Sequence, residues 1–442
     1  MRKGLLGSVA ALVASAGLAF GQTPQSRPMD PSSVAPTPLV PGQPGPSSGP
    51  LPMAPLPPGV MPEGMPAGPD GYGPAGLFNG GGQQAGGYYL EKCWFNIDYI
   101  LWRMRNEPSN WPLAVQGTLP NGVNPFMPGA VTIFGGNDIV FDMANGARIE
   151  FGAWLPGQTK IGLDVTGAIT EAKTVRRAAS SGPLGIPELG MPFINELTGT
   201  IDSLFAATPG SPGSIFGEAK TQLWSTDIDV VGNVYRAMYF SANVIGGFSY
   251  FALAEALSVH WASAGNPNGF FLGAPNAAAS LMLDQFSTRN YLYGGNIGAQ
   301  FEYRYRNYTL NFESRLVMGV VDQLLNVNGY SQAGGVRVPG GLFTQTTNIG
   351  QRGTQEFGVV PQLHGELGWQ MNQSIRFTCG IDFLYASSMV RPGNQIDNVI
   401  NPTLIPFNPL FGTVGGTARP AQNFVVSDFY ALGVSFGVHV RY

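Results

Sequence analysis

The end of the chain carries the clearest alternation of apolar and polar positions. Residues 427–442 read SDFYALGVSFGVHVRY. One face of this segment is apolar or aromatic and consists of Tyr430, Leu432, Val434, Phe436, Val438, Val440 and Tyr442. Successive side chains of a strand point to opposite faces, so Ser435, His439 and Arg441 lie on the other face. This pattern is typical of the last strand of an outer-membrane β-barrel, and we interpret Phe436, Val438, Val440 and Tyr442 as its C-terminal signal.

The same alternation predicts ten antiparallel strands. Their ranges are Trp94–Arg103, Ala147–Leu155, Lys160–Thr170, Leu223–Tyr235, Met238–Tyr250, Leu292–Arg304, Tyr308–Val320, Phe357–Trp369, Ile375–Tyr385 and Phe429–Tyr442. Each is near or above the roughly 9 to 11 residues that a tilted strand needs to cross a bilayer. We therefore expect an all-β fold, an antiparallel transmembrane barrel of ten strands, or twelve if a long loop contains a further hairpin.

The connections between these strands alternate in length. Short turns are expected at Pro156-Gly157-Gln158, Arg236-Ala237, Tyr305-Arg306-Asn307 and Met371-Asn372-Gln373. The other connections are long. Short periplasmic turns and longer outer loops are the rule in outer-membrane barrels, and this pattern places both termini on the periplasmic side.

Charged side chains collect on the face opposite the apolar one, where they would line the lumen. The lumen candidates are Arg148, Glu150, Asp164, Asp227, Asp229, Glu302, Arg304, Glu313, Arg315, Glu366, Arg376 and Asp382. Two interpretations stay open: a path for small solutes, or an internal ion-pair network, which the mixture of signs favours. About eight strands enclose only room for side chains, so ten predict a constricted or plugged lumen. Trp94 and Trp102 share the face of Asn96 and Asp98, and parity alone does not place them at the membrane interfaces.

Composition supports the barrel. Charged residues make up 11% of the chain, against about 25% in a soluble domain. Beyond the N-terminus no apolar run approaches the roughly 20 residues of a membrane helix. The net charge of −4 gives no basic footprint for nucleic acid.

Two segments precede the barrel domain, which we assign to residues 88–442. Residues 1–21 combine Arg2 and Lys3 with an apolar run and small residues before Gln22, which predicts a cleaved signal peptide. Residues 22–87 are rich in Pro and Gly, and we expect a disordered linker. It would be a passive linker or, alternatively, a tether to peptidoglycan. Further expected partners are outer-membrane lipid and the barrel-assembly machinery.

Candidate catalytic chemistry is sparse. We expect His260 in an outer loop, and the three histidines, His260, His364 and His439, are not expected to approach one another. No His, Cys and Asp grouping has metal-ligand spacing, so the sequence predicts neither a metal, a cofactor nor catalysis. Cys93 immediately precedes the first predicted strand and Cys379 lies within the ninth. Closure of the barrel would not make these strands neighbours, which argues against a disulfide.

The long loops suggest a binding or surface role as a third possibility. They carry little charge and are rich in Gly and Pro, as in residues 181–217 and 394–416. The best candidate for a structured cap is Arg391, Pro392 and Gly393 followed by Asp397, although ordinary turn chemistry is the favoured explanation of this segment.

Several segments resemble one family. They are Trp94–Trp102 (WFNIDYILW), Phe134–Asp138 (FGGND), Asp284–Gly295 (DQFSTRNYLYGG), Gly340–Gly350 (GGLFTQTTNIG), Phe357–Pro361 (FGVVP), Met389–Asp397 (MVRPGNQID) and Asn401-Pro402. Together they are similar to the putative β-barrel porin-7 family, known mainly from planctomycete bacteria. The resemblance implies an outer-membrane barrel and supplies no catalytic residues. We therefore expect a porin-like barrel that lets small solutes diffuse or, alternatively, a non-conducting structural or surface-binding barrel whose outer loops contact partners.

Overall fold

The computed structural model describes residues 93–117, 123–157, 160–271 and 279–441. The expected signal peptide, the Pro-rich linker and the terminal Tyr442 lie outside the described residues. No helix in these four ranges is long and apolar enough to cross a membrane.

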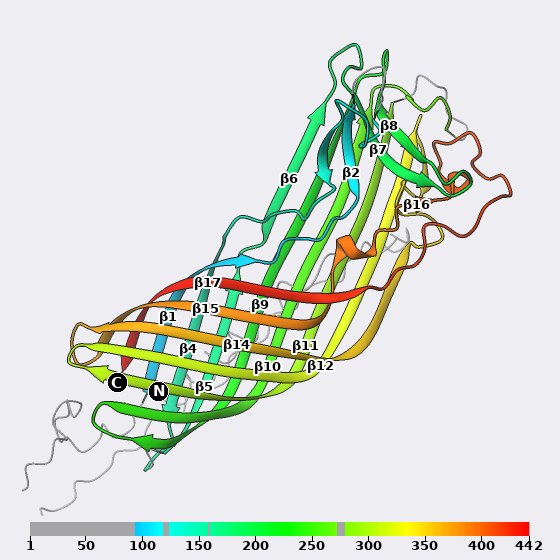
Figure 1. Cartoon of the computed structure of the whole chain (residues 1–442). Helices are drawn as coiled ribbons and strands as arrows, with labels where there is room; N and C mark the ends of the chain where they lie inside the picture. The colour runs from blue at the N-terminus through cyan, green and yellow to red at the C-terminus, as the bar shows by residue number, and fades with distance from the viewer. Residues whose placement is uncertain (1–92, 118–122, 158–159, 272–278, 442) are drawn as a thin grey trace, which may run out of the picture. The chain divides into compact units, whose positions relative to one another are not determined.

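Ten antiparallel strands close into a barrel (Figure 1). In ring order they are β1 (Cys93–Met104), β4 (Ala144–Trp154), β5 (Ile161–Thr170), β9 (Gly213–Arg236), β10 (Phe240–Ser263), β11 (Ser280–Tyr305), β12 (Tyr308–Ala333), β14 (Gly350–Gln370), β15 (Ile375–Val390) and β17 (Val426–Arg441). The first and last strands pair with each other, Trp94 opposite Arg441, and so form the closing seam. The predicted ten-stranded antiparallel barrel is confirmed, and the twelve-stranded alternative is not needed for the wall.

An apolar band surrounds the barrel near the rim where Trp94 of β1 and Arg441 of β17 lie. We call this rim the seam end. On β12, Tyr308, Leu310 and Phe312 are exposed, whereas Arg315 on the opposite face is buried. Tyrosine and tryptophan side chains such as Tyr303 and Trp369 edge the band. A lipid-facing belt flanked by aromatic residues is the form a membrane barrel takes.

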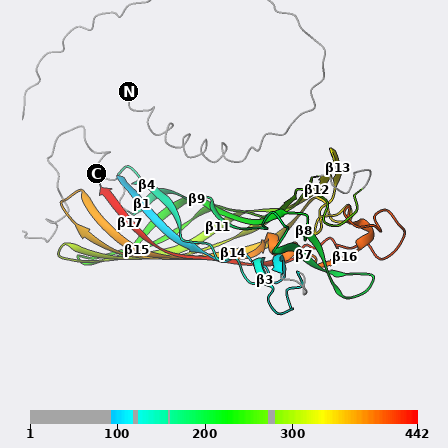
Figure 2. The same cartoon turned by 90° about the horizontal axis from the view of Figure 1, so that it is seen from above.

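The wall is much taller on one side, which the sequence did not predict. Strands β9 and β10 contain 24 residues each and β11 and β12 contain 26 each, whereas β1 contains 12 and β5 contains 10. The long strands continue past the apolar band, away from the seam end (Figures 1 and 2). Strand β6 (Lys173–Ser180) pairs with this extension of β9. Segments expected to be loops are therefore part of the wall.

A second, smaller sheet packs against the tall wall. It consists of β16 (Val399–Ile400), β7 (Glu188–Asn195), β2 (Pro112–Gly117), β3 (Val131–Gly135) and β8 (Ile201–Ala207). Two short 3-10 helices, η1 (Pro392–Gln395) and η2 (Pro402–Leu404), lie between β15 and β17, and β13 (Val336–Pro339) pairs with β12. We call the small sheet together with residues 391–425 the cap.

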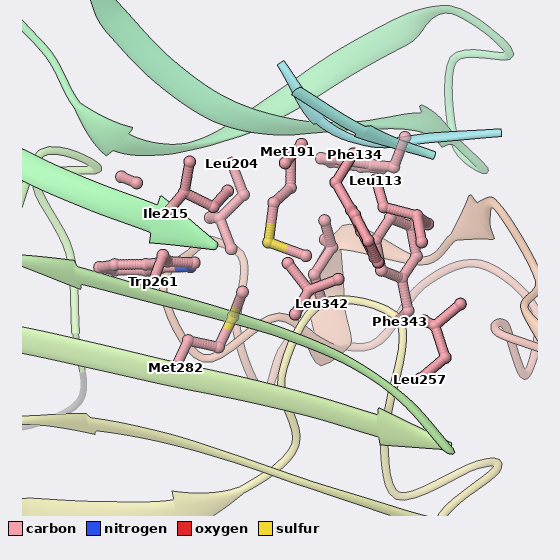
Figure 3. Packing of buried hydrophobic residues seen from close by; sticks show 14 of the residues in the cluster. Leu113, Phe134, Met191, Leu204, Ile215, Leu257, Trp261, Met282, Leu342 and Phe343 are labelled. Carbon is pink, nitrogen blue, oxygen red and sulfur yellow. The ribbon is translucent and has the colours of Figure 1, made fainter. Parts of the chain in front are cut away.

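The cap and the tall wall share one hydrophobic core (Figure 3). Leu113, Phe134 and Met191 from the cap meet Trp261 and Met282 from the wall in this cluster. All five side chains are at most 2% exposed. At about 1.5 to 3 kcal/mol for each fully buried large apolar side chain, this core is enough to hold the cap in place.

Candidate functional site

The lumen of the barrel is the candidate site, and its layer nearest the seam end is basic. Arg376 and Arg441 both approach Glu302 Oε2, at 3.2 and 2.8 Å. Arg304 pairs with the other oxygen of Glu302. Three guanidiniums therefore share one carboxylate.

The next layer is acidic, and two arginines bridge it. Arg148 reaches Asp98 at 2.9 Å and Asp382 at 2.7 Å. Arg315 reaches Asp227 and Asp229 at 2.8 Å each and Glu313 at 3.0 Å. Arg148 joins β4 to β1 and β15, and the contacts of Arg315 with Asp227 and Asp229 join β12 to β9, so these pairs tie the wall together across the lumen.

Both tryptophans whose position the sequence left open point into the lumen. Trp94 Nε1 donates to Glu150 at 2.8 Å and to Asp164 at 2.9 Å. Trp102 Nε1 lies 3.4 Å from Asp382 Oδ2. A buried indole N–H needs an acceptor, and the inward carboxylates provide it.

Two histidines meet in this layer, which corrects the expectation that none would. His364 Nε2 and His439 Nε2 lie 3.6 and 3.3 Å from the same atom, Glu366 Oε2. His364 Nδ1 also contacts Asp382 at 2.8 Å. The expectation was wrong because β14 and β17, although far apart in the sequence, are separated in the ring only by β15.

His260 is not in an outer loop, which corrects a second expectation. It lies within β10, on the tall part of the wall, and stacks on Phe216 with ring centroids 4.4 Å apart. Its Nε2 lies 3.2 Å from Ser258 Oγ. Burial lowers the pKa of His260, which keeps the ring neutral at pH 7.

A cavity of about 90 Å³ lies inside the acidic layer, and its walls include Asp98, Glu150, Arg315 and His439. On the cap side of this cavity the inward positions become apolar. Every wall strand except β5 contributes to one buried cluster that includes Ile100, Leu223, Phe251, Leu292, Val321, Leu384 and Phe429. We call this cluster the apolar layer; it crosses the lumen between the charged layers and the cap.

The predicted cap residue Arg391 is fully buried where the lumen meets the cap. Its Nη2 lies 3.2 Å from Glu107 Oε2 and 2.7 Å from Glu255 Oε1. Glu107 also accepts a hydrogen bond from the Gly393 N–H at 2.7 Å. Burial, together with the nearby Glu255 carboxylate, raises the pKa of Glu107 to about 8.

The other predicted cap residues are ordered as well. Pro392 begins η1, and Asp397 is buried and pairs with Arg419 at 2.7 Å.

A further buried carboxylate, Asp284 on β11, accepts the backbone N–H groups of Leu342 and Thr344 at 3.1 and 2.9 Å. Burial raises the pKa of Asp284 to about 6.

All twelve predicted lumen residues lie on inward faces, where salt bridges or hydrogen bonds hold them. The structure adds residues that the sequence did not single out: Asp98, Glu107, Glu255 and Asp284. Asp98 alternates with outward-facing Ile97 and Tyr99, a pattern that already placed it on the inward face. Nothing in the local sequence marks Glu107 and Glu255, because their partner Arg391 is remote along the chain.

Comparisons with solved structures return outer-membrane barrels. Outer membrane protease OmpT from Escherichia coli is 10% identical, with a TM-score of 0.39 over 79% of this chain and 97% of that chain. A Pseudomonas aeruginosa FadL homologue is 8% identical, with a TM-score of 0.19 over 79% and 89%. The P. putida toluene transporter TodX is 6% identical, with a TM-score of 0.17 over 80% and 90%. These low scores carry no argument about activity.

A search among curated proteins gives no match. The family comparison does: the model described as putative beta barrel porin-7 matches residues 94–442. The match spans the whole barrel from β1 to the last residue, which confirms the resemblance seen in the sequence. The chain therefore belongs to the putative β-barrel porin-7 family of porin-like outer-membrane barrels.

Proposed function

We propose that this barrel is closed to diffusing solutes and acts as a structural or surface-binding protein. The cap is the surface that contacts its partners. The observation that carries this proposal is the apolar layer. Leu223, Phe251 and Leu292 belong to it and are at most 2% exposed. An aqueous path would have to pass this layer and then the core beneath the cap, which contains residues such as Trp261 and Phe343.

The charged layers, on the seam-end side of the apolar layer, also support a closed lumen. The arginines of these layers are engaged in ion pairs, as in the Arg315 contacts with Asp227 and Asp229. Barrels that hold open aqueous channels have roughly 16 or more strands, whereas this wall has ten. The passage of small solutes, the other expected role, is therefore the less favoured one.

The cap offers a surface for partners. Phe126, Leu184, Ile186 and Leu197 project from it or from its neighbouring connections and are 45 to 75% exposed. The proposal assigns the contact with another molecule to these exposed side chains. A catalytic role is not favoured: the Ser258 and His260 pair faces Glu218, which is engaged with Lys220 at 2.8 Å.

Conductance tests the proposal. The mature chain, residues 22–442, is refolded, its folding is verified by heat-modifiable gel migration, and it is inserted into a planar bilayer. We expect a folded but electrically silent protein. Steady openings whose conductance scales with salt concentration would contradict a closed lumen and restore the diffusion pore.

We further propose that the seam end faces the periplasm, with both termini on that side. Residues 22–87 then extend through the periplasm as a linker toward the peptidoglycan. The support is the pairing of Trp94 with Arg441, which puts both barrel ends at the same rim. An epitope tag in the exposed stretch around Val414 should be labelled on intact cells, whereas a tag in residues 22–87 should need a permeabilised outer membrane. The reverse labelling would overturn this orientation.

A further inference from the structure

Three side chains in the acidic layer aim ligand atoms at one point. They are Asp98 on β1, Glu366 on β14 and His439 on β17, and all three residues are at least nine-tenths buried. His439 Nε2 lies 3.2 Å from Asp98 Oδ1 and 3.3 Å from Glu366 Oε2. All three ligand atoms lie within 4.8 Å of one another.

The two separations from His439 Nε2 suit one bound metal ion. Zinc-type ions bind imidazole nitrogen and carboxylate oxygen at about 2.0 to 2.2 Å, which places neighbouring ligand atoms roughly 3.0 to 3.5 Å apart in tetrahedral or octahedral geometry. A single N–H on His439 would otherwise have to serve both carboxylates, at distances near the long end of the usual hydrogen-bond range.

The surroundings hold the carboxylates in this pose. Asp98 keeps Oδ1 toward the point because Arg148 Nε binds its Oδ2 at 2.9 Å. Glu366 keeps Oε2 there because Asn311 Nδ2 donates to its Oε1 at 2.8 Å. Gly437 leaves room for Asp98, since a Cβ at that position would collide with Oδ1. Supporting hydrogen bonds of this kind orient the ligands of protein metal sites.

An independent observation is the charge of the adjoining cavity. Its lining contains six carboxylates, namely Asp98, Glu150, Asp227, Glu313, Glu366 and Asp382, against the guanidiniums of Arg148 and Arg315. The imidazoles of His364 and His439 complete the ionisable groups of this lining. Even with both imidazoles charged, the lining itself holds two more carboxylates than cationic groups. The nearest further cations are the guanidiniums of the basic layer, of which Arg441 is attracted to Glu150 and Glu366. The acidic surplus within the lining favours a cation there.

A buried hydroxyl beside the cluster points the same way. Ser435 is the inward residue next to Gly437 on β17 and is 2% exposed. Its Oγ has no hydrogen-bond partner among the described residues. Ser435 lies opposite Gly380, which in turn lies opposite Glu366, so a water bound to an ion beside Glu366 would supply the missing partner.

We propose that Asp98, Glu366 and His439 bind one divalent transition-metal ion of the zinc type, with water from the cavity completing its shell. The ion joins three strands, and two of them, β1 and β17, form the closing seam of the barrel. It therefore acts as a staple across the seam. The arginines on one side and the apolar layer on the other restrict access, so the ion is captured while the barrel closes. This inference does not depend on whether the lumen conducts.

Two measurements test the proposed metal site: the metal content of the protein and the thermal stability of the closed barrel. The full mature chain is refolded with zinc or with EDTA, desalted, analysed for metal by mass spectrometry, and heated in steps on a heat-modifiability gel. His439→Gln removes a ligand and keeps a polar side chain. His260→Gln is the matched control, because it changes an imidazole on the tall part of the wall that stacks on Phe216 and does not line the cavity.

We expect one zinc per chain in the wild type and in the His260→Gln variant, and at least a tenfold weaker retention in His439→Gln. Zinc should raise the temperature of gel conversion only for the first two proteins. Should His439→Gln fail to fold, Glu366→Gln takes its place. A folded wild type without stoichiometric zinc, or equal retention in the two histidine variants, would overturn the proposal.

Discussion

At the residue scale, the most informative group is the fully enclosed set of Arg391, Glu107 and Glu255. One guanidinium faces two carboxylates, so one negative charge is in excess. Burial and Glu255 raise the pKa of Glu107 to about 8. Glu107 is therefore protonated at neutral pH, and the set is then electrically balanced.

The raised pKa of Glu107 predicts a pH dependence of stability. An unfolded glutamate has a pKa of about 4.3, so between pH 4.3 and about 8 the folded protein holds a proton that the unfolded chain has released. The free energy of unfolding should fall as pH rises through this window, by up to roughly 1.4 kcal/mol per pH unit. Urea midpoints from tryptophan fluorescence at pH 5 to 9 measure it.

The Glu107→Gln variant is the control for this pH dependence, because its side chain cannot titrate. The difference in midpoint between wild type and variant isolates the contribution of Glu107 from that of other ionisable groups. A difference that does not change between pH 5 and 8 would show that the Glu107 carboxyl titrates normally.

Removing the cation of the same set should cost far more than removing an exposed one. Arg391→Met leaves Glu107 and Glu255 buried without their partner, and we expect a loss of about 3 to 5 kcal/mol. Arg419→Met is the comparison, since the Arg419 side chain is 42% exposed beside Asp397 and should lose at most about 1 kcal/mol. Equal losses in urea unfolding would contradict the assigned role of Arg391.

At the element scale, the strands show why the sequence predicted the barrel but not the cap. On β12 the apolar side chains from Tyr308 to Val320 face outward toward lipid. Farther along the same strand, Leu325 and Val327 are buried on the inward face, while Asn326 and Asn328 are exposed. The alternation continues, but its polarity reverses where lipid gives way to water. A strand prediction based on apolar residues on the outward face therefore ends at Val320.

The cap strands could not be predicted for a different reason. Strand β7 (ELGMPFIN) is buried along most of its length and shows no alternation. Its neighbours β2 and β16 are remote in the sequence. Local propensity carries little of the information that specifies such contacts. The inward charges were predictable by parity, whereas the meeting of His364 and His439 required the order of the strands around the ring.

One glycine sets the distance between the cap and the wall. The ring of Phe134 on β3 occupies the place that a side chain of Gly217 on β9 would take. Gly217→Ala should push β3 away from the wall while the barrel still forms. We expect much faster proteolysis of the cap with unchanged heat-modifiable migration. Gly246→Ala, where the nearest atom is the Asn296 carbonyl oxygen at 3.6 Å, should behave like wild type.

At the scale of the whole molecule, the lumen is a stack of layers with different polarity. From the seam end these are the arginine layer around Glu302, the acidic layer with its cavity, the apolar layer, and the core under the cap. The sequence left a solute path and an ion-pair network open. The strand number predicted a constricted or plugged lumen, but the sequence could not show the apolar layer, because the run from Phe251 to Val259 has apolar residues at most positions and does not reveal which side chains face inward.

The last prediction concerns how far the bilayer extends along the barrel wall. Ile297 and Leu281 lie on the same outward face of β11 and are 61% and 42% exposed. Ile297 lies within the apolar band and Leu281 lies on the tall extension beyond it. Because a basic side chain at the bilayer midplane costs about 2 to 4 kcal/mol and near the interface about 0 to 1, Ile297→Arg should destabilise the protein far more than Leu281→Arg.

Reversible urea unfolding in lipid vesicles measures both variants against wild type. The two substitutions add the same charge to the same strand, so any difference reports the surroundings of the outer face and not strand propensity. If both arginines cost the same, the bilayer would have to extend over the tall wall as well. The cap would then lie at the membrane surface and could not be a surface raised toward partners, and the division of β11 into a lipid-facing and a water-facing half would be wrong.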